Sequence, residues 1–339
     1  MSVTKISIER VNEVEHHPDA DRLDIIQVLG YKVVCNRDQF KVGDAAIYFP
    51  PDILIPEETS KQLGVFKYLK HAVYPGEEIK TRCRVGAARL RGVPSHGFVI
   101  GPVWKPEVFG FDVTQRFRGH KYNPPKRENA GNAESEDPRF CRYTSIENIQ
   151  RHPNILKSGE EVIITEKLHG TNCRIGRING EYMAGSHKVQ RKAGEGLYWQ
   201  FFDKVKPLLD AIGGDVIIFG EIFGPGVQDM DYGLSIKGFR AFDIVMNGRY
   251  MDYDWFKAIC SNHNVEIVPE LYRGPFSPEV VEEHTYGRTT FDGVKAKFKD
   301  REGCVIRPLY ERDDPKIGRV ILKSVSADYR NRKGGTDVE

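Results

Sequence analysis

The stretch that decides the fold is VIITEKLHGTNCRIG, residues 162–176. An apolar run, rich in β-branched residues, predicts a strand that delivers Lys167 to its end, and Gly170, Thr171 and Asn172 follow in a turn. A lysine held there is placed to attack phosphorus if it is neutral, which requires burial or nearby positive charge, including a metal ion. A surface lysine before a hairpin turn has the same local pattern, so this stretch alone leaves both interpretations open.

Four later segments also place a functional residue type beside a predicted strand. They are VIIFGEIFGPG (216–226) with Glu221, FRAFDIV (239–245) with Phe239 and Phe242, REGCVIRP (301–308) with Glu302, and RVILKSVSADYRNRK (319–333) with Lys323. A strand-end carboxylate can accept from a ribose hydroxyl or hold a metal ion, and an exposed aromatic ring can stack on a base. Each feature taken singly is more typical of a structural residue.

Composition narrows the class of protein. The chain has 339 residues, 40% hydrophobic and 29% charged, which excludes full disorder and suggests about two domains. It contains no apolar run of the roughly 20 residues that span a bilayer, and its charged N-terminus lacks a secretory apolar core. Six cysteines without a C-x-x-C pair suit a reducing compartment, so a cytoplasmic protein without membrane contact is expected.

The pattern of strands and turns predicts the domain order. Residues 1–122 carry short apolar runs punctuated by glycine and proline, which favours a small barrel or sandwich. Residues 123–138, NPPKRENAGNAESEDP, have the composition of a linker. Residues 139–333 form the second predicted domain, and 334–339 a tail.

Positive charge concentrates in the first domain, although the net charge of the whole chain is only +2. Lys80, Arg82 and Arg84 are spaced by two, which places them on one face of a strand, and Arg89 and Arg91 follow. Such a face can track a phosphate backbone. The alternative is a solvated face balanced by acidic residues elsewhere in the fold.

The five segments occur in an order that resembles motifs I, III, IIIa, IV and V of the covalent nucleotidyltransferases, which include RNA ligases, DNA ligases and capping enzymes. DNA ligases usually have aspartate where this chain has His169, whereas EKLHGTN (166–172) and YTSIEN (143–148) resemble the RNA ligase 2 family. HPDADRLDIIQV (17–28) and FKVGDAAIYFPPDILIP (40–56) resemble an OB fold. An OB domain that precedes the catalytic domain is similar to the OB-containing RNA ligases of the Deinococcus and Naegleria type.

This resemblance implies an α+β fold, with an N-terminal OB-fold β-barrel before an ATP-grasp-like nucleotidyltransferase domain of antiparallel sheets flanked by helices. It implies an ATP-dependent RNA ligase that seals 3′-hydroxyl and 5′-phosphate ends through lysyl-AMP and an adenylylated 5′ end. The expected cofactors are ATP and Mg²⁺ or Mn²⁺. The expected partner is RNA, or a nicked RNA/DNA duplex with RNA on the 3′-hydroxyl side, and the protein is expected to be a monomer. The alternatives are a DNA ligase and an inactive homologue that binds nucleic acid.

The resemblance also implies a role for each residue. Lys167 is the nucleophile, Glu302 helps to bind the metal ion, and Lys323 contacts the α-phosphate. The nucleotide site further takes Glu166 in the adenine pocket, Phe242 stacked on adenine, Glu221 at the ribose or a metal ion, Asn172 at the activated end, and His169 and Gly170 from motif I. Lys80, Arg82, Arg84, Arg89 and Arg91, with Asn172, form the expected nucleic-acid-binding set.

Two departures from the family pattern leave questions open. GSHKVQRK (185–192) offers His187, Lys188 and Arg191 where the RNA ligase 2 family has an arginine after serine. The last motif often carries two lysines, but this chain has Lys323 alone. Either one lysine suffices, or Arg319 or another cation substitutes.

Overall fold

The computed structural model describes residues 4–73, 81–102, 108–122, 133–135, 137–194, 196–291 and 298–332. The chain falls into two compact units. The first comprises Met1–Arg127, Asn148–Pro153 and Val325–Glu339, and the second comprises Glu128–Glu147 and Asn154–Ser324. The predicted borders at 122 and 139 stay a prediction, because most of the 123–138 segment lies outside the described residues.

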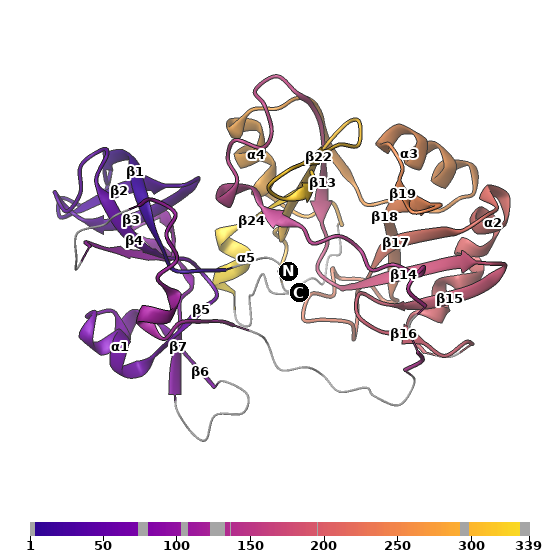
Figure 1. Cartoon of the computed structure of the whole chain (residues 1–339), viewed down its shortest axis with the longest axis horizontal. Coiled ribbons are helices and arrows are strands. Elements are labelled where there is room, and N and C mark those ends of the chain that lie inside the picture. The colour runs from indigo at the N-terminus through magenta and orange to yellow at the C-terminus, as the bar shows by residue number, and fades with distance from the viewer. Residues whose placement is uncertain are drawn as a thin grey trace. The chain divides into compact units, whose positions relative to one another are not determined.

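Strands dominate the first unit (Figure 1). A five-stranded sheet has the order β10-β4-β1-β2-β3, formed by β1 (Ser7–His16), β2 (Leu23–Val28), β3 (Tyr31–Asn36), β4 (Ala45–Phe49) and β10 (Phe98–Ile100). A four-stranded sheet has the order β11-β5-β7-β6, formed by β5 (Ile53–Pro56), β6 (Lys70–Val73), β7 (Thr81–Arg84) and β11 (His120–Lys121). The remaining elements are the hairpin β8 (Ala87–Leu90) and β9 (Val93–His96), α1 (Glu57–Gln62), α5 (Ala327–Asn331) and the 3₁₀ turns η1 (Phe66–Tyr68), η2 (Thr114–Phe117) and η4 (Ile149–Arg151).

The first strand explains how this unit curves. β1 pairs with β4 through its first residues and with β2 through its last, and the register shifts between Val11 and Glu13. A bulge at that point bends the strand and lets it serve two neighbours. Burial alternates along β2, as a strand with one core-facing side requires. The result is the strand-rich barrel that the sequence predicted, with its apolar core inside.

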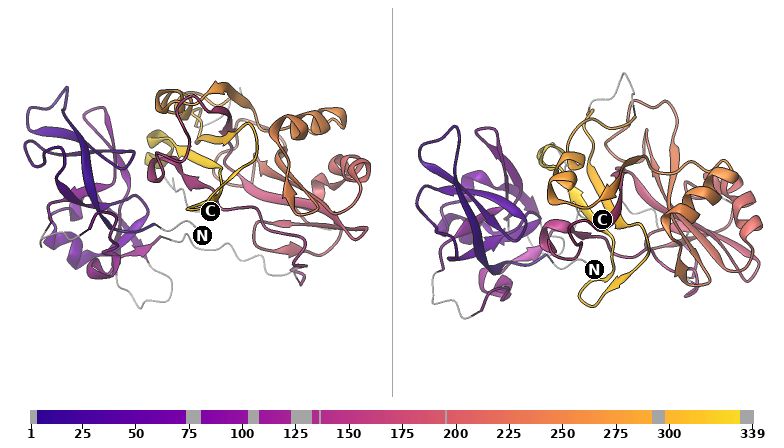
Figure 2. Two further views of the ribbon diagram at one scale, coloured as in Figure 1. Left: turned by 45° about the horizontal axis from the view of Figure 1, so that its top comes forward. Right: turned by 90° about the horizontal axis from the view of Figure 1, so that it is seen from above.

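The second unit contains two larger sheets (Figure 2). The six-stranded sheet has the order β16-β15-β14-β17-β18-β19, formed by β14 (Thr171–Ile178), β15 (Glu181–Ser186), β16 (Gln190–Arg191), β17 (Val216–Phe223), β18 (Gly238–Met246) and β19 (Arg249–Tyr250). The five-stranded sheet has the order β12-β24-β21-β13-β20, formed by β12 (Glu147–Asn148), β13 (Glu161–Lys167), β20 (Glu270–Pro275), β21 (Gly303–Pro308) and β24 (Leu322–Val325). The other elements are the ribbon β22 (Asp313–Asp314) and β23 (Gly318–Arg319), the helices α2 (Phe202–Ile212), α3 (Tyr253–Asn262) and α4 (Pro278–Thr285), and the turn η5 (Trp199–Phe201).

The two faces of the six-stranded sheet have different partners. One face packs its apolar side chains against Val205, Leu208 and Leu209 of α2 and Phe256 and Cys260 of α3. Ile217 and Phe219 of β17 alternate with the residues of that face and belong to a separate cluster on the opposite side. This second face continues along β17 to Glu221, so it is the face that carries this predicted site residue. No helix in the described part of the chain is long and apolar enough to cross a membrane.

Candidate active site

Lys167 and Glu302 meet where β13 ends and β21 begins. The antiparallel register places Lys167 opposite Gly303, so Glu302 lies one residue before the paired position. Lys167 Nζ is 2.9 Å from Glu302 Oε1, and the two side chains are 12% and 3% exposed. The strand pairing therefore brings together a lysine and a carboxylate that lie far apart in the sequence, in a nearly buried ion pair.

The turn after Lys167 is held tightly against β17. A Cβ atom on Gly170 would lie 2.1 Å from the carbonyl oxygen of Ile222, so only glycine allows this approach. The backbone N–H of His169 donates to the hydroxyl of Tyr232 at 2.6 Å. Because Ile222 follows Glu221, this packing fixes Lys167 relative to Glu221.

The imidazole of His169 lies between two carboxylates. Its Nε2 is 2.7 Å from Asp229 Oδ1, and its Nδ1 is 3.7 Å from Glu302 Oε2. His169 therefore lies beside the Lys167–Glu302 pair, and its expected role in nucleotide binding stays a prediction.

Glu221 and Asn172 share one face of the six-stranded sheet. They occupy directly opposite positions on β17 and β14, and opposite residues of an antiparallel pair project to the same side. This is the side away from α2 and α3, because Cys173 and Ile222, the next residues along these strands, lie in the cluster that packs on those helices. A carboxylate and an amide are thus presented together on one surface.

The structure distinguishes the two phenylalanines of β18. Phe239 is 1% exposed and belongs to the cluster under the helices. Phe242 is half-buried on the opposite face, where its ring makes an edge contact with Tyr143 at a centroid distance of 4.8 Å. Phe242 therefore lies on the same face as Glu221, and its expected stacking on adenine stays a prediction.

Glu166 has a different environment from its neighbour Lys167. Its side chain is 1% exposed and accepts from Thr289 Oγ1 at 2.5 Å, from the Thr290 N–H at 2.9 Å and from Thr290 Oγ1 at 2.7 Å. The carboxylate therefore ties the segment 289–290 to the end of β13. Its expected place in the adenine pocket stays a prediction.

Lys323 and Arg319 are both buried, but in different ways. Lys323 lies on β24, which neighbours β21 in the sheet, and is 6% exposed. Arg319 donates from Nη2 to Asp243 Oδ2 at 2.6 Å and from Nε to Glu311 Oε2 at 2.6 Å. Burial is the largest single influence and by itself would lower the pKa of Arg319, but Asp243, Tyr143 and Glu311 together outweigh it and raise the pKa. Arg319 is thus engaged in an internal ion network.

Comparison with known proteins finds matches for both parts of the chain. Residues 160–325 match the family model for RNA ligase. Residues 5–103 match a model for an OB-fold domain. A search of curated proteins found no match.

Solved structures confirm the fold. The chain is similar to Naegleria gruberi RNA ligase with PPi, at 23% identity and a TM-score of 0.77, covering 96% of this chain and 98% of that one. A variant of the same ligase with AMP and Mn gives 22% identity and a TM-score of 0.79, covering 98% and 100% of the two chains. The predicted order of an OB-fold barrel followed by an antiparallel-sheet ligase domain is therefore confirmed.

Several residues that contact the site of the RNA ligase domain were missed by sequence reasoning. They are Asp229 and Tyr232, which contact His169, and Thr289 and Thr290, which bond Glu166. All lie in loops without a motif spacing of their own, so no sequence signal marks them. In the turn between β15 and β16, where the family pattern has an arginine after serine, His187 is half-buried and Lys188 is exposed.

The cations expected to bind nucleic acid have varied environments. Lys80 lies outside the described residues. Arg82 is 7% exposed and donates from Nη1 to the Arg118 carbonyl at 2.9 Å, and Arg84 donates from Nε to Asp52 Oδ1 at 2.9 Å. Cys83 between them lies in the barrel core, so Arg82 and Arg84 share the other face of the strand, and that face is largely covered.

The two later cations of this set lie at the β8–β9 hairpin. Arg89 makes a two-point ion pair with Asp328 of α5, at 2.7 and 2.9 Å. Arg91 is exposed in the hairpin turn, with a positive φ of 45°. The nucleic-acid-binding role of the whole set stays a prediction.

Two orphaned oxygen atoms indicate what ligand suits the RNA ligase site. Glu302 Oε2 and Asn172 Oδ1 are buried and have no hydrogen-bond partner among the described residues. Buried acceptors rarely stay unsatisfied, and carboxylate and amide oxygens are ligands that hard divalent cations prefer. In the part of the chain that the structure describes, no group of three His, Cys, Asp or Glu side chains could hold a metal ion alone. These residues fit a divalent ion that takes its other ligands from phosphate and water.

Proposed function

We propose that this protein is an ATP-dependent RNA ligase that joins 3′-hydroxyl and 5′-phosphate ends. The observation that carries the proposal is the buried Lys167–Glu302 pair at 2.9 Å within a domain of the RNA ligase family. Among the structural neighbours, the Naegleria gruberi ligase has been solved with ATP and Mn and with AMP and Mn. ATP as substrate and Mn²⁺ or Mg²⁺ as the divalent ion follow for this chain by that likeness.

Lys167 acts as the nucleophile in the first step. Its Nζ attacks the α-phosphorus of ATP, a P–N bond forms, and the bond to the β-phosphate oxygen breaks as pyrophosphate leaves. The amine must first lose its proton, and Glu302 is the carboxylate within reach of that proton. Lys323 stabilises the charge on the α-phosphate. Glu302, and Glu221 if its carboxylate reaches the same position, would hold a divalent ion, which would supply further positive charge to the reaction.

The remaining side chains hold the nucleotide. Phe242 offers a ring on the site face for stacking on adenine, and Glu221 accepts from a ribose hydroxyl when it does not bind the metal ion. Gly170 allows the motif I turn to approach the nucleotide site closely. The imidazole of His169 lies beside the carboxylate of Glu302. Glu166 stabilises the adenine pocket from beneath by holding the 289–290 segment.

Two further steps complete the ligation. The 5′-phosphate of the RNA attacks the lysyl-bound AMP, so the P–N bond breaks and a 5′-5′ pyrophosphate linkage forms. The 3′-hydroxyl then attacks the activated phosphate, AMP leaves, and a phosphodiester bond forms. Asn172 positions the activated end, because its buried amide oxygen requires a donor or a metal ion. The preferred substrate is a nick with RNA on the 3′-hydroxyl side, whose 2′-hydroxyl distinguishes it from DNA. The protein acts as a monomer in the cytoplasm.

The test uses ATP labelled at the α-phosphate, with Mg²⁺ or Mn²⁺, and a denaturing gel. The wild type retains the label, and Lys167→Ala does not. Lys157→Ala, a substitution of an exposed lysine in the same unit, is the matched control and keeps wild-type labelling. A nicked substrate with RNA at the 3′-hydroxyl then releases the label as free AMP, and the strand is sealed. Labelling of Lys167→Ala at the wild-type level would refute the assignment of the nucleophile.

A further inference from the structure

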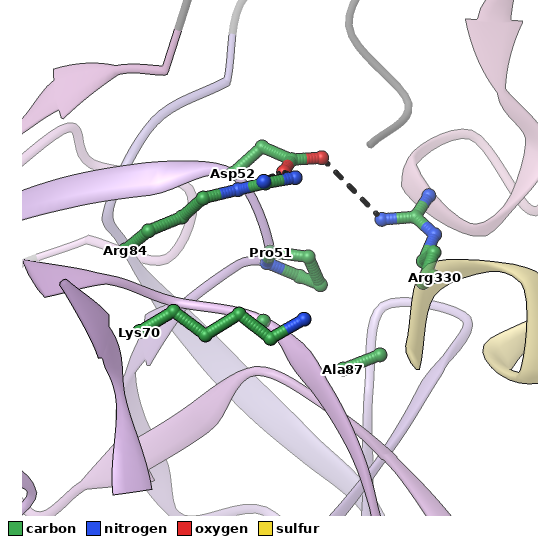
Figure 3. A pocket seen from close by; sticks show the side chains of 7 residues that line it. Pro51, Asp52, Lys70, Arg84, Ala87 and Arg330 are labelled. Atoms are coloured by element: carbon green, nitrogen blue, oxygen red, sulfur yellow. Dashed lines mark hydrogen bonds and ion pairs between the residues drawn. The ribbon is translucent and has the colours of Figure 1, made fainter. Parts of the chain in front are cut away.

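A small pocket in the first unit gathers positive charge outside the adenylylation site. The ammonium of Lys70 and the guanidinium groups of Arg84 and Arg330 line it, and the Asp52 carboxylate lies between the two guanidinium groups (Figure 3). The other lining residues, Pro51, Gly86 and Ala87, carry no charge. All seven belong to the first unit, so the pocket is built within one body.

The strand register forces two of these cations together. Lys70 and Arg84 occupy directly opposite positions on β6 and β7. Like charges at such a position destabilise a sheet unless an anion lies between them. Burial lowers the pKa of Lys70, and the positive charge of Arg84 lowers it further. The fold therefore holds the ammonium where it is electrostatically unfavourable, which is typical of an anion site.

Asp52 is the single carboxylate among the described residues that line the pocket, and it does not balance the three lining cations. Asp52 Oδ1 accepts from Arg84 Nε at 2.9 Å, and its Oδ2 lies 3.8 Å from Arg330 Nη1. Of the three lining cations, Lys70 is the most exposed, whereas the side chains of Arg84 and Arg330 are 13% and 7% exposed. An entering phosphate oxygen would thus meet the ammonium first, with two oriented guanidinium groups behind it.

An exposed aromatic ring lies two residues before Lys70 in the chain. Leu69 is extended, at φ −100° and ψ 153°, and packs against the barrel core. Its neighbours, Tyr68 at the end of η1 and Lys70 at the start of β6, are both exposed. The Tyr68 side chain is 70% exposed, and Lys67 Nζ lies 5.0 Å from its ring centroid. An exposed aromatic ring among cations is what single-stranded nucleic acid uses for stacking.

We propose that this pocket binds a backbone phosphate of the RNA substrate while an adjacent base stacks on Tyr68. The inference rests on the proposed function for its choice of RNA. The neighbouring aromatic ring favours a polynucleotide over a free anion, because inorganic phosphate has no base to stack. Arg84 then acts as a ligand of one defined phosphate, oriented by Asp52, rather than as part of a continuous basic stripe.

The experiment measures the binding of a fluorescent 20-nucleotide single-stranded RNA by anisotropy at several salt concentrations, with Lys70→Met, Lys70→Arg and Tyr68→Ala. Loss of one charge-assisted phosphate contact weakens binding about tenfold. It also reduces the slope of log affinity against log salt by about 0.7 in Lys70→Met. Lys70→Arg retains most of the affinity, since it keeps the charge. Lys41→Met, at an exposed lysine of the same unit outside the pocket, is the matched control and binds like the wild type.

The outcomes separate the possibilities. Wild-type affinity and salt slope in Lys70→Met would overturn the proposal. A thermal shift with inorganic phosphate that Lys70→Met abolishes, with RNA binding unchanged, would also overturn it, since the pocket would then serve a free anion. Self-adenylylation of the wild type is measured in parallel, because its absence would count against the ligase function while the RNA titration still tests the pocket.

Discussion

Gly170→Ala is the substitution whose effect on catalysis follows most directly from the structure. The added methyl group would lie 2.1 Å from the carbonyl oxygen of Ile222, where ordinary contact begins at 3.4 Å. The carbonyl oxygen of Ile222 is a backbone atom in the middle of a sheet, which cannot rotate away as a side chain can. The motif I turn and β17 must therefore separate by about 1 Å to remove the clash. Close packing around these segments opposes that movement.

The size of the expected loss of rate follows from the functional residues on the motif I turn and on β17. Lys167 lies three residues before Gly170, and Glu221 precedes Ile222, so the separation moves the nucleophile relative to Glu221. A displacement of about 1 Å at a reacting group costs on the order of 10²-fold in rate. Overpacking of this kind costs about 1–3 kcal/mol of stability, so the protein is expected to remain folded.

The assay is the initial rate of self-adenylylation with α-labelled ATP, with circular dichroism to verify folding. Gly101→Ala is the matched control, because a Cβ atom there meets nothing within 4 Å. We expect the control to label at the wild-type rate and Gly170→Ala to label about 10²-fold more slowly. A folded Gly170→Ala protein that labels within threefold of wild type would refute the reasoning about this turn.

Three further predictions concern charge. Glu302→Gln keeps the shape but removes the charge beside Lys167, so labelling should fall by at least ~10² at every Mn²⁺ concentration; full recovery at high Mn²⁺ would exclude an essential carboxylate. Asp243→Asn leaves Arg319 and Arg307 buried without their shared carboxylate, 2.6 and 3.3 Å away, and should lower the free energy of unfolding in urea. The expected loss is about 3–5 kcal/mol, and a loss below about 1 kcal/mol would contradict it. Burial, helped by the charge of Arg330, lowers the pKa of His96 to about 4, so the first unit should lose stability as pH falls from 6.5 towards 4. Hydrogen exchange of β9 should show this loss in the wild type but not in His96→Phe.

The ends of strands were the most predictable part of the site. Lys167, Glu221 and Lys323 each lie on a continuous apolar run that predicts a buried strand, and Glu302 directly precedes such a run. Once the strands pair, the positions of these side chains follow from register with little further freedom. Alternation also predicted that Arg82 and Arg84 share a face.

A local sequence pattern does not predict which segments cover a strand face, nor which distant residue contacts a given side chain. Arg82 proved to be buried because other parts of the first unit cover its face, including the backbone of Arg118. Asp229 reaches His169 from a loop about 60 residues away, and such a contact depends on loop geometry rather than on spacing. For the same reason the hydrogen bonds of Glu166 to Thr289 and Thr290 could not be anticipated.

The pair Lys70 and Arg84 shows how this limit bears on function. Along the sequence, Arg84 belongs to a run of cations spaced by two, and that run suggests a diffuse electrostatic surface. Across the sheet, its direct neighbour is Lys70, a residue outside the run that no periodicity singles out. Antiparallel pairing places the like charges of Lys70 and Arg84 opposite each other, and Asp52 from the β4–β5 turn orients Arg84. The fold therefore turns part of a run of cations into a localised charged site. Positions where a fold opposes a local rule in this way are where a ligand is expected to offset the cost, and here the ligand that fits the charge is phosphate.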